Sequence, residues 1–194
     1  MVMRFFMTIL ALAVISGAAF AQDSKTSAGL LAWERIFSVA SHPRCANCHV
    51  GVSGRPGWDD LGYGARRLHG MNVVADASRI GAESIPCRTC HIGAEGNNDT
   101  PYAAPRVDDA WRLPPVDLAW RGKSSNEICT QLRTPETNDG FELVDLVEHV
   151  RTSVFVSYGF NPGNGRTAAP GSVDELVADL QIWGAAGMPC KAEN

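Results

Sequence analysis

The chain has 194 residues and a formal net charge of −4. This length fits a single domain, and the mild acidity argues against nucleic acid or an anionic membrane as the partner. Glycine and proline are frequent, at 19 and 11 residues, whereas aromatic residues make up only 8% of the chain, which indicates many loops around a modest hydrophobic core.

The first residues have the pattern of a secretory signal peptide. Arg4 supplies a positive charge, an apolar run follows over residues 5–15, and residues 19–21 form an A-x-A cleavage site. We therefore expect residues 1–21 to be removed and residues 22–194 to lie in the periplasm, without stable membrane insertion. An uncleaved signal peptide that acts as a membrane anchor is the alternative.

A short helix is predicted over residues 30–39, where apolar residues recur on one side, with Ser27 as its N-cap. It leads into Cys45-Ala46-Asn47-Cys48-His49, a C-x-x-C-H pentapeptide that returns as Cys87-Arg88-Thr89-Cys90-His91. Apart from this second pentapeptide, residues 50–122 show no sustained period, so irregular segments are expected there.

The C-terminal part, residues 123–190, carries stronger helical patterns. Capping boxes of the form S-x-x-E begin at Ser124 and at Ser172, and each opens a predicted helix. A third helix is predicted between them, over residues 141–154, where apolar residues recur at helical spacing.

The repeated pentapeptide is the attachment signature of c-type haem. Two thiols one short turn apart can each add to a vinyl group of the porphyrin, and the histidine that follows is placed to ligate the iron. Export agrees with this chemistry, because such haem is attached outside the bacterial cytoplasm. We expect two covalent haems, bound by Cys45, Cys48 and His49 and by Cys87, Cys90 and His91.

Three alternatives to haem account less well for the cysteine pairs. A zinc ribbon usually places its two pairs about 15–20 residues apart, whereas residues 49–86 separate the pairs here. A thioredoxin-like dithiol needs a βαβ context that is not visible near either motif. Two structural disulfides would not explain why a histidine follows each cysteine pair.

Two cysteines lie outside the motifs, Cys129 and Cys190. In an oxidising compartment such a pair is expected to form a disulfide, and two free thiols are the alternative. The bond would close a loop of about 60 residues, which is worth about 4 kcal/mol in the chain-entropy model.

Each iron has a second axial position, opposite His49 or His91, and its occupant sets the reduction potential. His69 is the strongest candidate because it lies in the irregular segment between the motifs, where the backbone can adapt to the iron. Met71 competes with it for the same place.

Three further candidates are less direct. His149 lies on the predicted helix 141–154, and Asp145, one turn earlier, could hold its second ring nitrogen. His42 is too close to Cys45 to reach over its own haem but could serve the other one. Met188 is expected to pack near the disulfide. Which histidine faces which iron is left open by the spacing.

Several short stretches of the chain form a set: residues 41–49, 69–73, 87–91, 111–115, 122–132, 145–149 and 159–163. They resemble a family of small secreted C-x-x-C-H proteins that is commonly labelled as a subunit of isoquinoline 1-oxidoreductase. The resemblance implies a cytochrome-like electron carrier, serving a molybdenum hydroxylase of N-heteroaromatic compounds, and supports His149 as an axial ligand. The chain has neither a glycine-rich cofactor loop nor the size for a molybdopterin site, so it is not the hydroxylase itself.

The expected fold is mostly α, a small, loop-rich dihaem cytochrome c-like domain with the haem motifs in residues 41–91. The expected function is one-electron transfer between a dehydrogenase or hydroxylase and a downstream acceptor, without enzymatic activity of its own. Two alternatives come from other functional classes: a small dihaem peroxidase, or a haem-based sensor, each with one open iron site.

Overall fold

The computed structural model describes residues 3–57, 68–70, 73–75, 91, 112–163 and 167–192, with side chains from residue 22 onward. Over these residues the chain is mostly helical and loop-rich, as predicted, and its only bridge outside the helices pairs Gly57 with Leu68. The elements are α1 (Met3–Ala40), α2 (Pro43–Ala46), α3 (Ser125–Leu132), the 3₁₀ turn η2 (Pro135–Thr137), α4 (Leu143–Thr152), α5 (Val154–Phe160) and α6 (Val173–Ala185).

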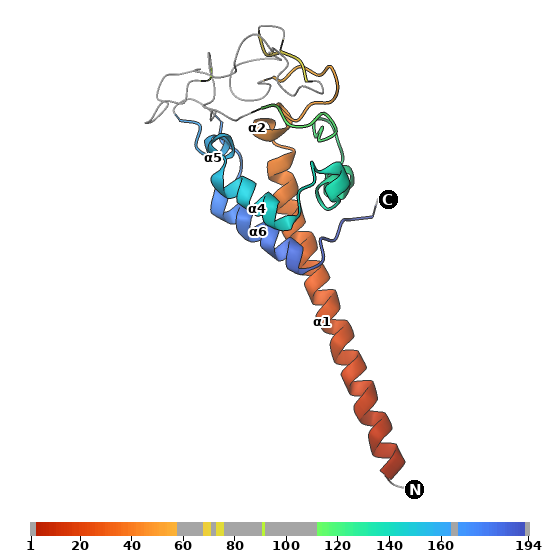
Figure 1. Ribbon diagram of the computed structural model, residues 1–194. Helices are drawn as coiled ribbons and strands as arrows, with labels where there is room; N and C mark the ends of the chain where they lie inside the picture. The colour runs from red at the N-terminus through yellow and green to blue at the C-terminus, as the bar shows by residue number, and fades with distance from the viewer. Residues whose placement is uncertain are drawn as a thin grey trace.

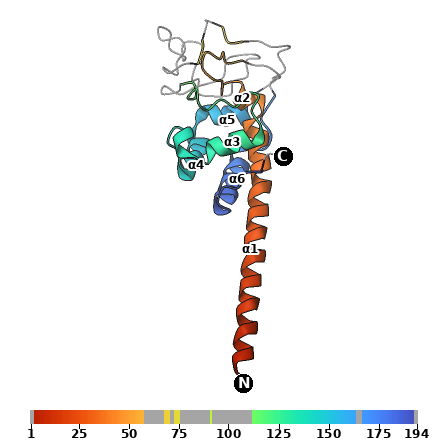
Figure 2. The same cartoon turned by 90° about the vertical axis from the view of Figure 1, so that its right-hand side faces the viewer.

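Helix α1 is much longer than the predicted helix 30–39. Ser27, expected as its N-cap, lies inside it, because the chain has no proline before Pro43 to interrupt the helical hydrogen bonds. The N-terminal part of α1, where the predicted signal peptide falls, projects away from the other helices (Figures 1 and 2). None of the helices in the described part of the chain has the length and apolarity that a membrane span requires.

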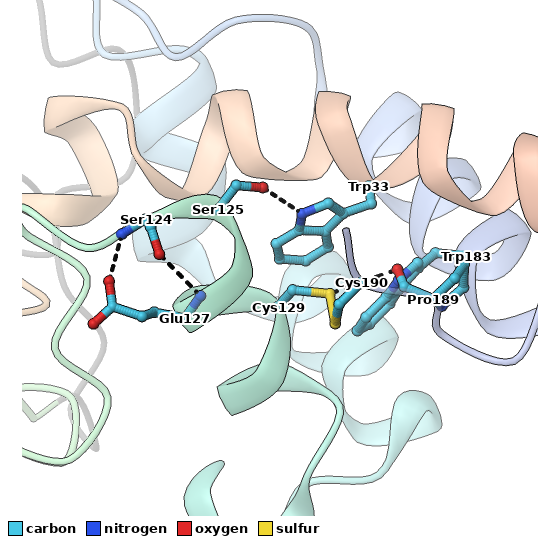
Figure 3. Close-up of a disulfide and its surroundings, with 8 residues drawn as sticks. All are labelled: Trp33, Ser124, Ser125, Glu127, Cys129, Trp183, Pro189 and Cys190. Atoms are coloured by element: carbon cyan, nitrogen blue, oxygen red, sulfur yellow. Dashed lines mark hydrogen bonds between the residues drawn. A yellow bond between two sulfur atoms is a disulfide. The ribbon is translucent and has the colours of Figure 1, made fainter. Parts of the chain in front are cut away.

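The hydrophobic core forms where α1 meets α6 and α3. Trp33 of α1 and Trp183 of α6 are fully buried, with ring centroids 5.2 Å apart. Their indole N–H groups donate to Ser125 Oγ at 2.7 Å and to the Pro189 carbonyl at 3.0 Å. Both tryptophans lie beside the Cys129–Cys190 disulfide, which ties α3 to the segment after α6 and confirms the predicted pairing (Figure 3).

The two predicted capping boxes begin their helices in slightly different ways. At α3, Ser124 Oγ accepts from the Glu127 N–H and the Glu127 carboxylate accepts from the Ser124 N–H, as a capping box requires (Figure 3). At α6, Ser172 Oγ likewise accepts from the Glu175 N–H, but the carboxylate of Glu175 accepts from the Ser172 hydroxyl instead of its backbone. The prediction of both helix starts is confirmed.

The helix predicted over residues 141–154 is confirmed as α4, but its bounds are shorter, and a new helix, α5, starts after a break at Ser153. The backbone of Ser153 is extended, with φ −68° and ψ 117°, and its hydroxyl accepts from the Val156 N–H. Ser153 therefore ends α4 and begins α5, since a serine hydroxyl can replace a helical hydrogen bond. Val154, expected on the buried stripe, is 43% exposed as a result.

We predict that the double variant Cys129→Ala/Cys190→Ala is less stable than the wild type. Cross-linking two residues 61 positions apart restricts the unfolded chain, so its loss should lower the free energy of unfolding by about 4 kcal/mol. Denaturant unfolding, followed by circular dichroism, measures the change. A loss below about 1 kcal/mol would contradict the role given to this bond.

Gly29 should tolerate no larger residue, because α1 closely approaches the C-terminal end of α6 and the segment after it. A Cβ atom on Gly29 would lie 2.4 Å from Ala186 Cβ and 2.8 Å from a ring carbon of Pro189. We expect Gly29→Ala to lower the free energy of unfolding by about 1–3 kcal/mol despite the better helix propensity of alanine. Gly159→Ala in α5 is the matched control and should cost less, since a Cβ atom there would come no closer than 3.9 Å to Arg44 Cβ.

Candidate functional site

The first C-x-x-C-H motif begins on α2, directly after the end of α1. His42 caps α2 through its Nδ1 atom, which accepts from the Arg44 N–H at 3.2 Å, and Pro43 occupies the first helical turn. The motif then closes a turn, with the His49 N–H donating to the Cys45 carbonyl at 3.1 Å. His42, a candidate axial ligand from the sequence, thus has a structural role at the start of its own motif.

The two cysteines of this motif are free thiols. Burial raises the pKa of Cys45 to about 12 and that of Cys48 to about 11, while the positive charge of Arg44 opposes the shift at both. The charge of Arg121 also lowers the pKa of Cys48. Burial therefore favours the protonated form of both thiols, which lie one turn apart.

His49 is held on two sides by residues 118–120. Its Nδ1 atom lies 2.9 Å from the Leu118 carbonyl, so the ring carries its proton there and leaves Nε2 as a bare nitrogen. The Trp120 ring lies flat against it, with centroids 3.4 Å apart and planes within 5°. This is how a ligating histidine is oriented, with one nitrogen fixed and the other presented.

Arg121 extends this support to the rest of the motif. Its backbone N–H and that of Trp120 donate to the His49 carbonyl, and its Nη2 donates to the carbonyl and the side-chain oxygen of Asn47. Asn47 is only 5% exposed, so these oxygens have little access to water. We call Leu118, Trp120 and Arg121 the clamp of the first motif.

The charge of His149 is one of the influences on the pKa of His49. Burial lowers the pKa of His49 to about 3, the hydrogen bond to Leu118 raises it, and the charge of His149 lowers it further. His149 is exposed on α4 and meets the edge of the Phe141 ring, with centroids 5.9 Å apart. Asp145, expected to orient His149, instead accepts from the Glu142 N–H at 2.9 Å and caps α4.

His69 and His91 meet directly, although 22 positions separate them in the sequence. Their Nε2 atoms are 3.5 Å apart, their ring planes lie within 16° of each other, and the centroids are 5.8 Å apart. The centroid separation exceeds the nitrogen separation by about two ring radii, so the rings lie end to end and not face to face. His69 Nδ1 lies 2.8 Å from the Gly70 carbonyl, which leaves Nε2 of His69 to face His91.

This end-to-end pair has the shape of two ligands on opposite sides of one metal ion. Metal–imidazole bonds of roughly 2 Å on each side need nitrogen atoms roughly 4 Å apart, slightly more than the 3.5 Å observed. A small outward movement of either ring would therefore admit an iron atom. The residues present fit the haem group that the motifs imply.

Other predicted site residues are placed elsewhere or lie outside the described part of the chain. Cys87, Cys90 and Met71 are not among the described residues. Met188 packs against the α1–α6 core, as expected from its position beside the disulfide. Within the described residues, no group of three or more His, Cys, Asp or Glu side chains is arranged so that it could hold a metal ion.

The clamp could not be found from the sequence. Leu118, Trp120 and Arg121 belong to the segment 92–122, which has no motif or period that marks a functional role.

Comparison of the chain with family models, with curated proteins and with solved structures found no match.

Removal of Arg121, the clamp arginine, should make the fold around the first motif less stable. We expect Arg121→Ala to lower the free energy of unfolding by about 1–3 kcal/mol, because the buried oxygens of Asn47 lose the charged donor that Arg121 supplies. Arg133→Ala, at the exposed end of α3, is the matched control and should change it by less than about 0.5 kcal/mol. Equal losses in both variants, measured by denaturant unfolding, would argue against the clamp.

Proposed function

We propose that the protein is a periplasmic dihaem c-type cytochrome that carries single electrons. The observation that carries the proposal is the facing pair of His69 and His91, whose Nε2 atoms lie 3.5 Å apart. One of these histidines belongs to the second C-x-x-C-H motif and the other was selected from the sequence as a distal ligand. Together they would ligate the iron of the second haem from opposite sides.

The first site is supported by its own histidine. His49 follows two free thiols, and its Nδ1 faces the Leu118 carbonyl just as Nδ1 of His69 faces the Gly70 carbonyl. His149 is assigned as the second ligand of this iron because His69 already faces His91 and because the family resemblance supports His149 as an axial ligand. The assignment pairs His49 with His149 and His91 with His69, which the spacing of the sequence had left open.

Two filled axial positions favour a carrier over an enzyme. When bound, each haem supplies an iron that gains and loses one electron, and histidine on both sides sets a lower potential than methionine does. With both axial positions of each iron taken by histidines of the chain, no position on the iron would remain for a substrate. The alternative functions, a peroxidase or a sensor, would need one iron whose second axial position is not occupied by a histidine.

The partners would be a dehydrogenase or hydroxylase that supplies electrons and an acceptor that removes them. The resemblance to the proteins labelled as isoquinoline 1-oxidoreductase subunits points to a molybdenum hydroxylase as the donor. Such a role agrees with the signal-peptide pattern and with the mild negative charge of the chain.

The test is electron paramagnetic resonance of the oxidised protein, after its haem content has been fixed at two per chain. We expect two low-spin signals of the bis-histidine type. In His69→Met one of them should be replaced by a histidine–methionine signal and one reduction potential should rise, because methionine favours ferrous iron. His42→Asn is the matched control: asparagine keeps the cap of α2, and both signals should stay unchanged.

His149→Met separates the two irons. The variant should replace the other low-spin signal and leave the signal lost in His69→Met in place. A high-spin signal in the wild type, together with carbon monoxide binding by the reduced protein, would contradict the proposal of an electron carrier. It would favour the function of a peroxidase or a sensor. A chain without covalent haem would overturn the proposal altogether.

A further inference from the structure

Arg55 lies between the two candidate sites and touches the supports of both. Its carbonyl accepts from Nη1 of Arg121, the clamp arginine, at 3.5 Å. Its own Nη2 donates to the His69 carbonyl at 3.1 Å. Arg55 therefore connects the segment that holds His49 with the segment that carries His69.

The segment around Arg55 is paired with the segment around His69 by its backbone as well. The His69 N–H donates to the Pro56 carbonyl at 2.7 Å, and an isolated antiparallel bridge joins Gly57 to Leu68. A continuous set of contacts thus runs from His49 through Arg121, Arg55 and His69 to His91.

One N–H group of the Arg55 guanidinium makes no hydrogen bond within this set of contacts. Its Nε atom is buried and has no hydrogen-bond partner among the described residues, and the same holds for Nε1 of Trp120, which packs on His49. A buried N–H group, above all one of a charged guanidinium, is costly without an acceptor. The acceptor that suits a guanidinium best is a carboxylate, and a porphyrin of the haem type carries two.

We propose that Arg55 joins the two haem sites: its Nη2 positions His69, and its Nε, with Nε1 of Trp120, binds a carboxylate of the porphyrin held by the first motif. The inference rests on the proposed function and deepens it. A change at this one arginine reaches the surroundings of both irons, so the potentials of the two haems depend on a shared residue.

The test uses the full, haem-loaded chain with Arg55→Gln, which removes the charge and the Nε donor. Two readouts are needed: the propionate bending band in the resonance Raman spectrum, and the paramagnetic signal assigned to the His69 pair by His69→Met. We expect Arg55→Gln to move both and to lower both reduction potentials, because a nearby positive charge favours the reduced state. The band is assigned to the first haem in the Cys87→Ala/Cys90→Ala background, which retains that haem alone.

Two further variants separate the binding of the porphyrin carboxylate from the positioning of His69. Trp120→Phe keeps the ring against His49 but removes Nε1, so it should move the propionate band and leave the His69 signal in place. Arg55→Lys keeps the charge but not the fork of donors, so it should move both spectroscopic readouts with a smaller fall in the potentials. Arg55→Lys also provides the test if the Arg55→Gln variant does not fold. Arg112→Gln, which removes an exposed positive charge, should change neither spectroscopic readout.

The inference is overturned if Arg55→Gln leaves both readouts at their wild-type values, or if it moves only one of them. These outcomes are distinct from failure of the proposed function, which would be seen in the wild type as fewer than two haems or as a high-spin iron. With two haems and two low-spin signals in the wild type, only the role of Arg55 is at stake.

Discussion

The contact of α1 with α6 positions the rest of the described structure. Gly29 lets the two helices approach closely, Trp33 and Trp183 fill the space between them, and the Cys129–Cys190 bond adds α3 to the same core. Helix α1 ends at Ala40, and α2, which carries the first cysteine of the first motif, begins at Pro43. The core therefore sets the position of the first motif through a connection of only two residues.

The candidate ligands depend on carbonyl groups that a regular helix could not offer. Inside a helix each carbonyl accepts from the N–H four residues later, and is not free to orient a histidine. Leu118 and Gly70 lie in irregular segments, and their carbonyls face Nδ1 of His49 and of His69. The loop-rich composition of the chain is thus part of how its histidines are oriented, and not only a sign of a small core.

Local signals in the sequence predicted the parts of the fold that depend on local chemistry. The capping residues Ser124 and Ser172, the disulfide and the mostly helical class were predicted correctly, because each depends on a few neighbouring residues or on the count of cysteines. The break at Ser153 was missed because the apolar spacing continues across it, and a side-chain cap outweighs that spacing. The start of α1 was misplaced because Ser27 is a good cap, but no proline precedes it to interrupt the helix, which continues through this position.

Sequence reasoning named the candidate ligands, which stay predictions, since their residue types limit the choice. It did not find the residues that contact and orient these histidines. The carbonyl of Leu118 and the ring of Trp120 act through their places in space, and neither has a pattern in the sequence that marks it. The pairing of His69 with His91 likewise depends on how two irregular segments fold back, which no local rule determines.

Arginine suits the links between these segments for a physical reason. Irregular segments lack the regular hydrogen bonds of helices and sheets, so side chains must supply donors to their carbonyls. Arginine has five N–H donors in a planar fork, which lets Arg121 hold Asn47 and Arg55 at once, whereas a lysine has a single point of attachment. The same residues place positive charge beside the motif, where the charge of Arg121 lowers the pKa of Cys48. Support of the backbone and tuning of the motif are therefore two effects of one side chain, so a substitution of Arg121 should change both the stability and the pKa of Cys48.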